Sequence, residues 1–245
     1  MSNYLITGIS DGIGLAYLKT ILRRSPDAVF YGISRHVSPG LSELIAEFPG
    51  RLHYFPCDLS VPFPSLEEEL KSFLPIDLVL DGFFDNAGIY RPFLISQLNE
   101  ERIMETMNVN LISPIMLTKI VLKNFLRHKT KGSIVHVSSI AAHIGFNATS
   151  VYSAAKGGLE AFSRNVAQEW GSRQIRSNVV TLGLLDIGMS RVVPPSLQQE
   201  LKERSLLKRT TDIDTIIDTV EFLLSDRSAS ITGENIHINA GVYMA

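Results

Sequence analysis

A serine, a tyrosine and a lysine in the second half of the chain have the types and spacing that proton transfer to a carbonyl oxygen requires. Tyr152 and Lys156 stand four residues apart in a segment of helical period, so their side chains share one helix face. An ammonium group within a few ångströms stabilises a phenolate and lowers the pKa of a tyrosine from ~10 toward neutrality. Such a tyrosine exchanges a proton with a hydroxyl or carbonyl oxygen, and Ser139, at the end of a neighbouring apolar run, can hydrogen-bond the same oxygen. The Tyr-x-x-x-Lys spacing alone also occurs by chance in amphipathic helices, so other residues must support this interpretation.

Near the N-terminus, a glycine-rich turn joins an apolar run to a helical segment. It reads Thr7-Gly8-Ile9-Ser10-Asp11-Gly12-Ile13-Gly14. Glycines let the backbone approach a pyrophosphate, and the N–H groups and dipole of the following helix favour an anion. We therefore expect a dinucleotide to contact Gly8, Ser10, Asp11, Gly12, Ile13 and Gly14. A glycine-rich turn that binds no ligand is the alternative for the same pattern.

The second apolar run ends in Ser34 and Arg35, roughly twenty residues beyond Gly14, where a dinucleotide fold reads the adenosine ribose. An acidic residue there binds the 2′-hydroxyl, whereas an arginine binds a 2′-phosphate through two parallel hydrogen bonds. Ser34 and Arg35 therefore predict NADP(H). The negative charge of Asp11 opposes that preference, and a solvated arginine that leaves the site to NAD(H) is the alternative.

Seven short apolar runs, which alternate with longer segments of helical period, must position these residues. The runs are rich in Val, Ile, Phe and Tyr and predict strands over Tyr4–Thr7, Ala28–Ile33, His53–Phe55, Asp81–Phe84, Ser133–Ser138, Arg176–Thr181 and Asn235–Ile238. Helices are predicted over Gly14–Arg24, Asn99–Phe125 with a kink at Ser113-Pro114, Tyr152–Gly171 and Asp214–Leu224.

Strands that alternate with helices imply βαβ units and a parallel sheet covered on both faces. We predict an α/β fold: a single doubly wound Rossmann domain over residues 1–245, with a mostly parallel seven-stranded sheet and helices on both faces. The region Gly183–Thr211 departs from the pattern and reads as a loop or short-helix insertion. We assign the substrate loop to about residues 184–211.

Charge and composition exclude several other classes of protein. Lys and Arg number 23 against 25 Asp and Glu, a net charge of −2, so the basic excess of a nucleic-acid-binding protein is missing. The longest apolar runs fall short of the ~20 residues that a bilayer requires, and the N-terminus does not read as a signal peptide. We expect no membrane segment and a cytoplasmic location, which the single cysteine, Cys57, also fits. The six histidines form no paired ligand pattern, so no metal site is expected.

Together these motifs closely resemble those of the short-chain dehydrogenase/reductase (SDR) family over essentially the whole chain, and by eye most of all its 3-oxoacyl-carrier-protein reductase-like members. The matching positions are Thr7, Gly8, Gly12 and Gly14 in the glycine motif, Asp85-Asn86-Ala87-Gly88 in place of Asn-Asn-Ala-Gly, the set Asn110, Ser139, Tyr152 and Lys156, and Ile231-Thr232-Gly233-Glu234 before the last strand.

The resemblance implies an NAD(P)H-dependent oxidoreductase that interconverts a carbonyl and a secondary alcohol. NAD(P)H would deliver hydride to the carbonyl carbon while Tyr152 supplies the proton. Lys156 would lower the pKa of Tyr152 and hold the nicotinamide ribose, Ser139 would polarise the carbonyl, and Asn110 would anchor a water linking Lys156 to solvent. The implied cofactor contacts, besides the glycine turn, Ser34 and Arg35, are Asp58, Leu59, Asn86, Ala87, Gly88, Tyr152, Lys156, Gly183 and Leu185.

The family also suggests partners. The substrate would be a small-molecule carbonyl or alcohol, or an acyl thioester, with neither nucleic acid nor membrane involved. SDR proteins often form homo-oligomers, a tetramer or a dimer, through two long helices that correspond to Asn99–Phe125 and Tyr152–Gly171.

Two departures from the family pattern keep another interpretation open. Asp85 replaces an Asn, and Ile187 stands where the family commonly has a Thr that hydrogen-bonds the nicotinamide carboxamide or the phosphates. A non-catalytic dinucleotide-binding sensor or assembly subunit on the same fold would tolerate such changes. A sugar-nucleotide epimerase or dehydratase also uses Tyr and Lys, but those chains typically carry a longer C-terminal substrate domain.

Overall fold

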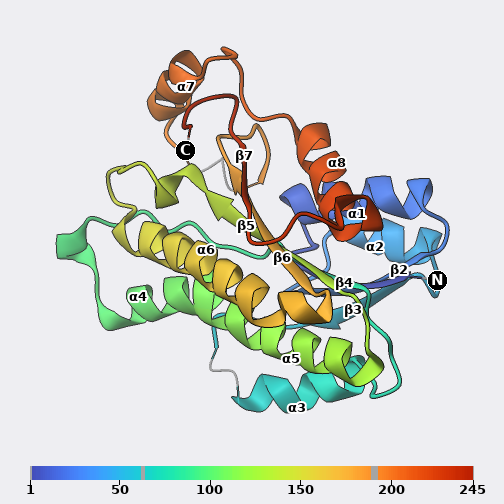
Figure 1. Cartoon of the computed structure of the whole chain (residues 1–245). Coiled ribbons are helices and arrows are strands. Elements are labelled where there is room, and N and C mark those ends of the chain that lie inside the picture. Colours follow the sequence, from blue (N-terminus) through green and yellow to red (C-terminus); the bar gives the residue numbers. More distant parts are fainter. Residues whose placement is uncertain (1, 62–63, 189–192, 245) are drawn as a thin grey trace.

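Seven strands form one sheet through the centre of the molecule (Figure 1). The computed structural model describes residues 2–61, 64–188 and 193–244. The strands are β1 (Ser2–Thr7), β2 (Ala28–Ser34), β3 (Leu52–Pro56), β4 (Gly82–Asp85), β5 (Ser133–Ser139), β6 (Arg176–Leu182) and β7 (Asn235–Ile238). All seven predicted strands are confirmed, and every neighbouring pair is parallel rather than only most of them.

The helices cover both faces of the sheet, as a doubly wound fold requires (Figure 1). One face carries α1 (Gly12–Arg24), α2 (Pro39–Glu47) and α8 (Ile213–Leu224). The other carries α3 (Pro64–Phe73), α4 (Glu100–Met107), α5 (Ser113–His128) and α6 (Ser150–Trp170). A further helix, α7 (Pro195–Arg204), lies beyond the carboxyl ends of the strands, inside the region predicted as a loop or short-helix insertion.

Two apolar cores, one on each face, hold the helices to the sheet. Successive strand residues alternate between them: Leu5 and Phe83 pack into the core under α5 and α6, whereas Ile6 and Phe84 pack under α1 and α8. This alternation follows from the two-residue period of a strand, and burial on both faces explains the nearly continuous apolar runs in the sequence.

The long helix predicted over Asn99–Phe125 is broken, but one turn earlier than expected. A π-helical turn spans Asn108–Ile112 between α4 and α5, and Pro114 lies in the first turn of α5, where a missing N–H is tolerated. Glu100–His128 is, among the described helices, long and apolar enough to cross a membrane. Half of its most apolar window is buried inside the fold, as in a core helix, so it is weak evidence for a membrane segment.

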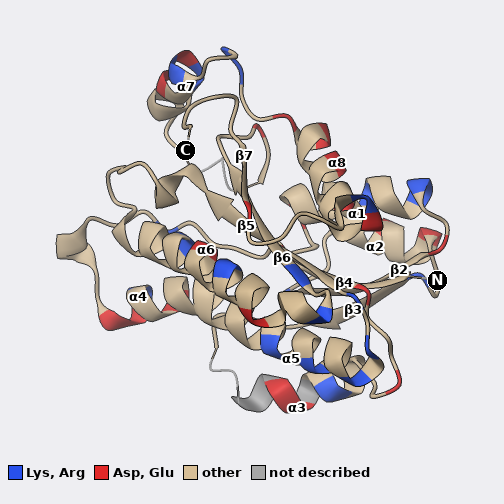
Figure 2. Cartoon of the chain, viewed as in Figure 1, with Lys and Arg blue, Asp and Glu red and all other residues tan. Residues whose placement is uncertain are grey.

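Positive and negative side chains are interspersed over the helices (Figure 2). For example, Lys119 and Lys123 of α5 lie 3.9 and 3.6 Å from the carboxylate of Glu67 on α3. This carboxylate therefore joins two neighbouring helices.

The strand order β3-β2-β1-β4-β5-β6-β7 determines where a site can form. The chain moves outward in one direction from β1 to β3, then crosses back to β4 and proceeds the other way. Connections therefore diverge between β1 and β4, and a crevice opens beyond their carboxyl ends, which is the usual ligand site of such sheets.

Candidate active site

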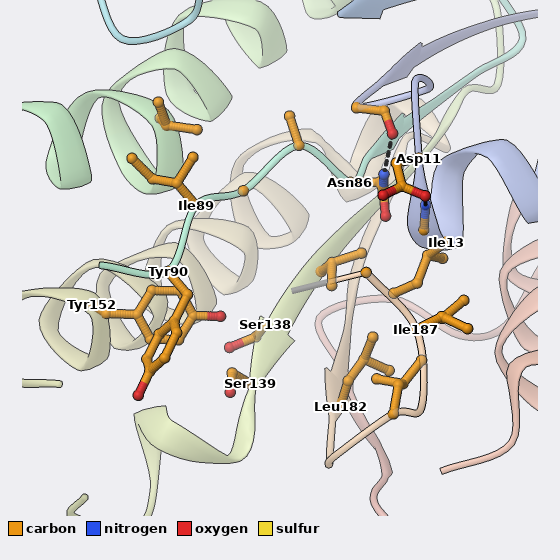
Figure 3. Close-up of a pocket in the computed structure, with 18 of the residues that line it drawn as sticks. Asp11, Ile13, Asn86, Ile89, Tyr90, Ser138, Ser139, Tyr152, Leu182 and Ile187 are labelled. Carbon is orange, nitrogen blue, oxygen red and sulfur yellow. Dashed lines mark hydrogen bonds between the residues drawn. The ribbon is translucent and has the colours of Figure 1, made fainter. Parts of the chain in front are cut away.

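A cavity of about 470 Å³ opens at the carboxyl ends of the strands (Figure 3). We call its two ends the α1 end, lined by the β1–α1 turn and the residues after β2 and β3, and the α7 end, lined by Ile140, Phe146, Leu184, Val193, Leu197 and Leu201. Figure 3 shows Tyr152, Tyr90 and the serines of β5 between these ends, with Asp11, Ile13 and Asn86 toward the α1 end. The cavity therefore joins the two motifs that the sequence separates by more than a hundred residues.

The glycines of the β1–α1 turn allow a close approach of backbone segments. Gly8 has a φ of +73°, and a Cβ there would lie 2.8 Å from the Cα of Ala87. A Cβ on Gly14 would lie 2.2 Å from the carbonyl oxygen of Gly8. Neither position accommodates a side chain, so both glycines are required by this turn.

The start of α1 offers donors to an anion. Asp11 is the N-cap, and its Oδ1 accepts the Gly12 amide at 2.7 Å. The next two amides, those of Ile13 and Gly14, donate to no group in the described part of the chain. A narrow glycine turn with two unsatisfied N–H groups at a helix N-terminus fits a dinucleotide pyrophosphate. Asp11 thus has a structural role as a cap, and its carboxylate also lines the cavity.

The residues after β2 and β3 include a positive side chain, Arg35, and a negative one, Asp58, at the α1 end. Arg35 is exposed, lines the cavity, and makes no hydrogen bond or ion pair with a described residue. Its guanidinium lies close enough to Asp58 to affect that carboxyl. Burial raises the pKa of Asp58, but hydrogen bonds from Ser60 and the charge of Arg35 outweigh it, and the net pKa is lowered. Ser34 donates to the carbonyl oxygen of His36 at 3.2 Å, which holds the loop that carries Arg35.

A buried polar network ties the end of β4 to the glycine turn. The side-chain amide of Asn86 donates hydrogen bonds to the carbonyl oxygens of Thr7 and Gly8, both at 3.0 Å. The hydroxyl of Thr7 accepts from the backbone of Asn86 and Ala87 and donates to Asp85 at 3.2 Å. The other carboxylate oxygen of Asp85 lies 2.9 Å from Nδ1 of His136, and both side chains are buried. Asp85, a departure from the family motif, is therefore explained by a partner on β5.

Tyr152 projects from α6 into the cavity beside Ser139 (Figure 3). Burial raises the pKa of Tyr152 to about 12; a hydrogen bond with Ser139 acts in the lowering direction, and the neighbouring Tyr90 phenol raises it. The rings of Tyr90 and Tyr152 meet edge to face, with centroids 5.4 Å apart. The lowering of the Tyr152 pKa predicted from Lys156 is therefore absent in this arrangement, because desolvation of the phenolate dominates.

Lys156 lies behind Tyr152 rather than on the cavity wall. Its Nζ donates to the carbonyl oxygen of Val137 at 2.8 Å and lies 6.0 Å from the Tyr152 ring centroid. Burial lowers the pKa of Lys156 to about 8, although Asp85 and Glu160 act to raise it. The pKa of this lysine is therefore lowered mainly because the charged form is desolvated beside the tyrosine.

Asn110 lies in the π-helical turn and is fully buried. Its side-chain oxygen accepts the Ile89 amide at 3.2 Å, and its side-chain nitrogen donates to the carbonyl oxygens of Ile89 and Thr106. These contacts attach the segment after β4 to the long helix. The side-chain amide is therefore engaged with backbone, and only the Asn110 backbone remains for the water that the sequence analysis assigned to it.

Most of the predicted site residues line one cavity. These are Gly8, Ser10, Asp11, Gly12, Ile13, Ser34, Arg35, Asp58, Leu59, Asn86, Ala87, Gly88, Ser139, Tyr152, Gly183 and Leu185. Gly14, Asn110 and Lys156 support the wall from behind. Gly183 is required by a close approach of strands, since a Cβ there would lie 2.8 Å from the Cα of Asn239.

The remaining predictions concern the region after β6. Ile187 lines the cavity and packs against the core under α1, so a hydrocarbon stands where the family Thr would be. His143, in the loop after β5, has its Nε2 3.1 Å from Glu160 and stacks on Tyr243 with centroids 4.6 Å apart. It is a hydrogen-bonded loop histidine.

Sequence reasoning missed two functional neighbours. Tyr90 stands two residues after Gly88, and an aromatic at the carboxyl end of a central strand was the available signal. Glu160 stands four residues after Lys156 on the same helix face and was not singled out. No group of three or more described His, Cys, Asp or Glu residues is arranged to hold a metal ion.

Known proteins resemble this chain over nearly its full length. A family model described as enoyl-(acyl carrier protein) reductase matches residues 8–243. L-xylulose reductase from Caenorhabditis elegans is 30% identical over 239 residues, 97% of this chain and 94% of that protein. The 3-oxoacyl-[acyl-carrier-protein] reductase FabG of Escherichia coli (strain K12) is 30% identical over 240 residues, 98% and 96% of the two chains.

Solved structures agree on the fold. A 4-hydroxyisoleucine dehydrogenase complexed with NADH and succinate superposes with a TM-score of 0.88 at 24% identity, covering 98% of each chain. Because the family model and two relatives at 30% identity each match nearly the whole length, the chain belongs to the short-chain dehydrogenase/reductase family, as its motifs predicted.

Proposed function

We propose that this protein is an oxidoreductase that uses NAD(P)H to interconvert a carbonyl and a secondary alcohol at Tyr152. The observation that carries the proposal is the shared cavity, in which the hydroxyls of Tyr152 and Ser139 face the same space as the amides of the β1–α1 turn. The dinucleotide would supply or accept a hydride. Gly8, Ser10, Gly12, Ile13 and Gly14 would hold its phosphates.

Each catalytic side chain has a role that its surroundings support. Tyr152 is a neutral phenol at neutral pH because burial raises its pKa to about 12, and a neutral phenol donates a proton to a carbonyl oxygen that gains charge. Ser139 would hydrogen-bond the same oxygen. Lys156 would return a proton to Tyr152 and hold the nicotinamide ribose, since its pKa of about 8 makes it a readily exchanging acid. Asn110 would help to position these three side chains, because it fixes the segment after β4 to the long helix.

NADP(H) is the proposed cofactor, with NAD(H) as the alternative. Arg35 stands at the α1 end without a hydrogen-bond partner among the described residues, and its charge is available to a 2′-phosphate. Asp58 and Leu59 would contact the adenine. Asn86, Ala87, Gly88, Gly183, Leu185 and Lys156 would surround the nicotinamide half.

The substrate is a small-molecule carbonyl or alcohol, or an acyl thioester. The relatives named L-xylulose reductase and 3-oxoacyl-[acyl-carrier-protein] reductase support this range. The segment at about residues 184–211, which includes α7, would order over the bound molecule.

We also propose one domain over residues 1–245, a cytoplasmic location and a homo-oligomer, a tetramer or a dimer. The single cysteine in the sequence suits a reducing compartment. On the long helix, Met104 and Ile112 expose 46% and 39% of their surface, which suits helix packing between subunits.

The alternative is a dinucleotide-binding protein that does not catalyse. Asp85 no longer supports it, because a carboxylate there is paired with Thr7 and His136. Ile187 remains its only support.

Substitution of Tyr152 by Phe distinguishes the proposed oxidoreductase from the non-catalytic alternative. The variant keeps the ring and loses the acidic hydroxyl, so we expect carbonyl-dependent NADPH oxidation to fall by at least about 10²-fold while the Kd for NADPH changes little. Tyr31→Phe is the matched control, since Tyr31 is a half-buried tyrosine remote from the cavity. Binding of NADPH without turnover by the unmodified protein, across a broad carbonyl panel, would favour the non-catalytic alternative.

A further inference from the structure

Charged side chains are confined to one end of the cavity. Among the described residues that line it, the charged or titratable ones other than Tyr90, Cys57 and Tyr152 are Asp11, Arg35, His36 and Asp58, and all of them belong to the α1 end. The α7 end contains Leu, Ile, Val and Phe side chains, which pack together as a separate apolar cluster around Ile140, Leu184 and Leu201. A molecule that enters this end loses its water without gaining an ionic partner from the described residues that line it.

Few hydroxyls at the α7 end remain available to a substrate. Thr149 lines the cavity, but its hydroxyl donates to the carbonyl oxygen of Phe146 at 2.8 Å and accepts from Ser153 at 3.2 Å. Ser139 and Tyr152 are reserved for the reacting oxygen in the proposed mechanism. Tyr90 is therefore the remaining phenol with no hydrogen-bond partner among the described residues.

Tyr90 lines the cavity directly beside Tyr152, the proposed acid. Its ring stands at 80° to the Tyr152 ring and crosses in front of it in Figure 3. Burial raises the pKa of Tyr90, so it presents a neutral aromatic edge and hydroxyl. Tyr90 lines the same cavity as Leu197 and Leu201 of α7.

We propose that the substrate is a ketone, or the corresponding alcohol, whose substituent on the α7 side is apolar and uncharged, and that Tyr90 selects this substituent by direct contact. The inference rests on the proposed function and narrows it. A carboxylate on that side would be desolvated without a partner, and the hydroxyls of a sugar would face hydrocarbon. The α7 end therefore disfavours both carboxylates and sugars.

Two pairs of substrates, each an uncharged ketone and a related keto acid, test the proposal. The rate of NADPH oxidation is measured with acetophenone against 4-acetylbenzoate, and with ethyl acetoacetate against acetoacetate; a pentulose is the polyhydroxylated probe. We expect kcat/KM for each uncharged ketone to exceed that of its acid, and that of the pentulose, by about tenfold or more. Equal or faster turnover of the acids or the pentulose overturns the proposal and leaves the proposed function intact. If the protein reduces none of the five compounds, the proposed function itself fails.

Substitutions test which residues determine the preference for an uncharged, apolar substituent. Leu197→Lys places a cation at the α7 end, and we expect it to reduce or invert the preference for acetophenone over 4-acetylbenzoate. Leu207→Lys is the control, because Leu207 is exposed at 60% and does not line the cavity. Tyr90→Ala should raise KM for acetophenone about tenfold more than KM for the non-aromatic ethyl acetoacetate, with NADPH binding retained. If Leu197→Lys and Tyr90→Ala change neither ratio while NADPH still binds, the α7 end is not the substrate side and the proposal is wrong.

Discussion

Lys156 carries its ammonium group in a place where water cannot reach it. The side chain is 3% exposed, and its Nζ has the Val137 carbonyl oxygen as its hydrogen-bond acceptor. Burial brings its pKa down to about 8. Keeping such a group charged at neutral pH opposes folding, and the role that we propose for Lys156 beside Tyr152 accounts for its presence.

Replacement of Lys156 by Met should therefore abolish turnover and stabilise the fold. An unfolded lysine keeps its proton up to pH ~10.5, whereas the folded one releases it near pH 8. Between these values the unfolded state binds more protons, so the stability of the wild-type protein rises with pH, and below pH 8 the full penalty applies. Urea unfolding at pH 7 should show the variant more stable by ~1–3 kcal/mol, with the difference vanishing by pH 10. A variant that is less stable at pH 7, with the same pH profile as wild type, would contradict this account of Lys156.

Arg35 gives a prediction about the cofactor. Removing a charge-assisted hydrogen bond to a phosphate costs ~1.5–3 kcal/mol, so Arg35→Ala should weaken NADPH binding about 10- to 100-fold and leave NADH binding nearly unchanged. Fluorescence titration with both dinucleotides measures this, with Arg127→Ala on the outer surface of α5 as the control. Tighter binding of NADH than of NADPH by the wild-type protein would refute the assignment.

Single residues differ in how far the sequence predicts them. Ser139, Tyr152 and the glycine turn were found because their chemistry depends on residue type and short spacing. The sign of the Tyr152 pKa shift was not, since it depends on the burial of the phenol and on Tyr90, which lies far away in the sequence. Spacing along a helix says which groups share a face but not how much water surrounds them.

At the level of elements, helix α6 places three titratable side chains at four-residue intervals. Tyr152 and Lys156 serve the cavity, and Glu160 binds the neighbouring strands and loop. Oε1 of Glu160 accepts a hydrogen bond from Ser138 on β5, another from Thr181 on β6 at 3.1 Å, and lies 3.1 Å from Nε2 of His143. The contact with Ser138, next to Ser139, holds the end of β5 against α6, the helix that carries Tyr152.

Replacing Glu160 by Leu removes the carboxylate that Ser138 and His143 contact, whereas Thr181 retains Asn235 as an acceptor. We expect a loss of ~2–4 kcal/mol in the free energy of unfolding and a larger drop in kcat than rise in KM, because the relative position of Ser139 and Tyr152 changes. Glu160→Gln keeps an acceptor oxygen and should recover most of the stability. Glu169→Leu, an exposed position on the same helix, should have no effect in urea unfolding or kinetics. Equal behaviour of the two Leu variants would show that Glu160 has no positioning role.

The boundaries of helices and strands were predictable where they depend on the local sequence, and not where they depend on distant contacts. The seven strands were predicted to within one or two residues, because runs buried on both faces stand out from helical periodicity. Helix α2 was not assigned in the sequence, since its apolar residues are few and its pattern is short. The break in the long helix was expected at Pro114 but lies at Asn108–Ile112. It forms where Asn110 bonds the backbone of Ile89, and nothing in the local pattern reveals that partner.

At the level of the whole molecule, the order of the strands brings the glycine turn after β1 close to Ser139 and Tyr152. The β1–α1 turn and the end of β5 are separated by β4 alone, so the glycine cradle and Tyr152 open onto one cavity. Alternating strands and helices predicted the doubly wound fold. They did not predict the α7 end, whose walls come from the loop after β5, the segment after β6 and α7, and whose apolar character appears only when these are assembled.

The central claim is that this arrangement transfers hydride to a carbonyl carbon with Tyr152 as the acid. The most direct test uses NADPH deuterated at both C4 positions with acetophenone, and reads the alcohol product by mass spectrometry and NMR. We predict that wild-type protein forms 1-phenylethanol with one deuterium on the carbinol carbon, and that Tyr152→Phe forms at least ~10²-fold less. Cofactor oxidation that leaves no deuterium at that carbon, or equal labelled product from Tyr152→Phe, would contradict the mechanism.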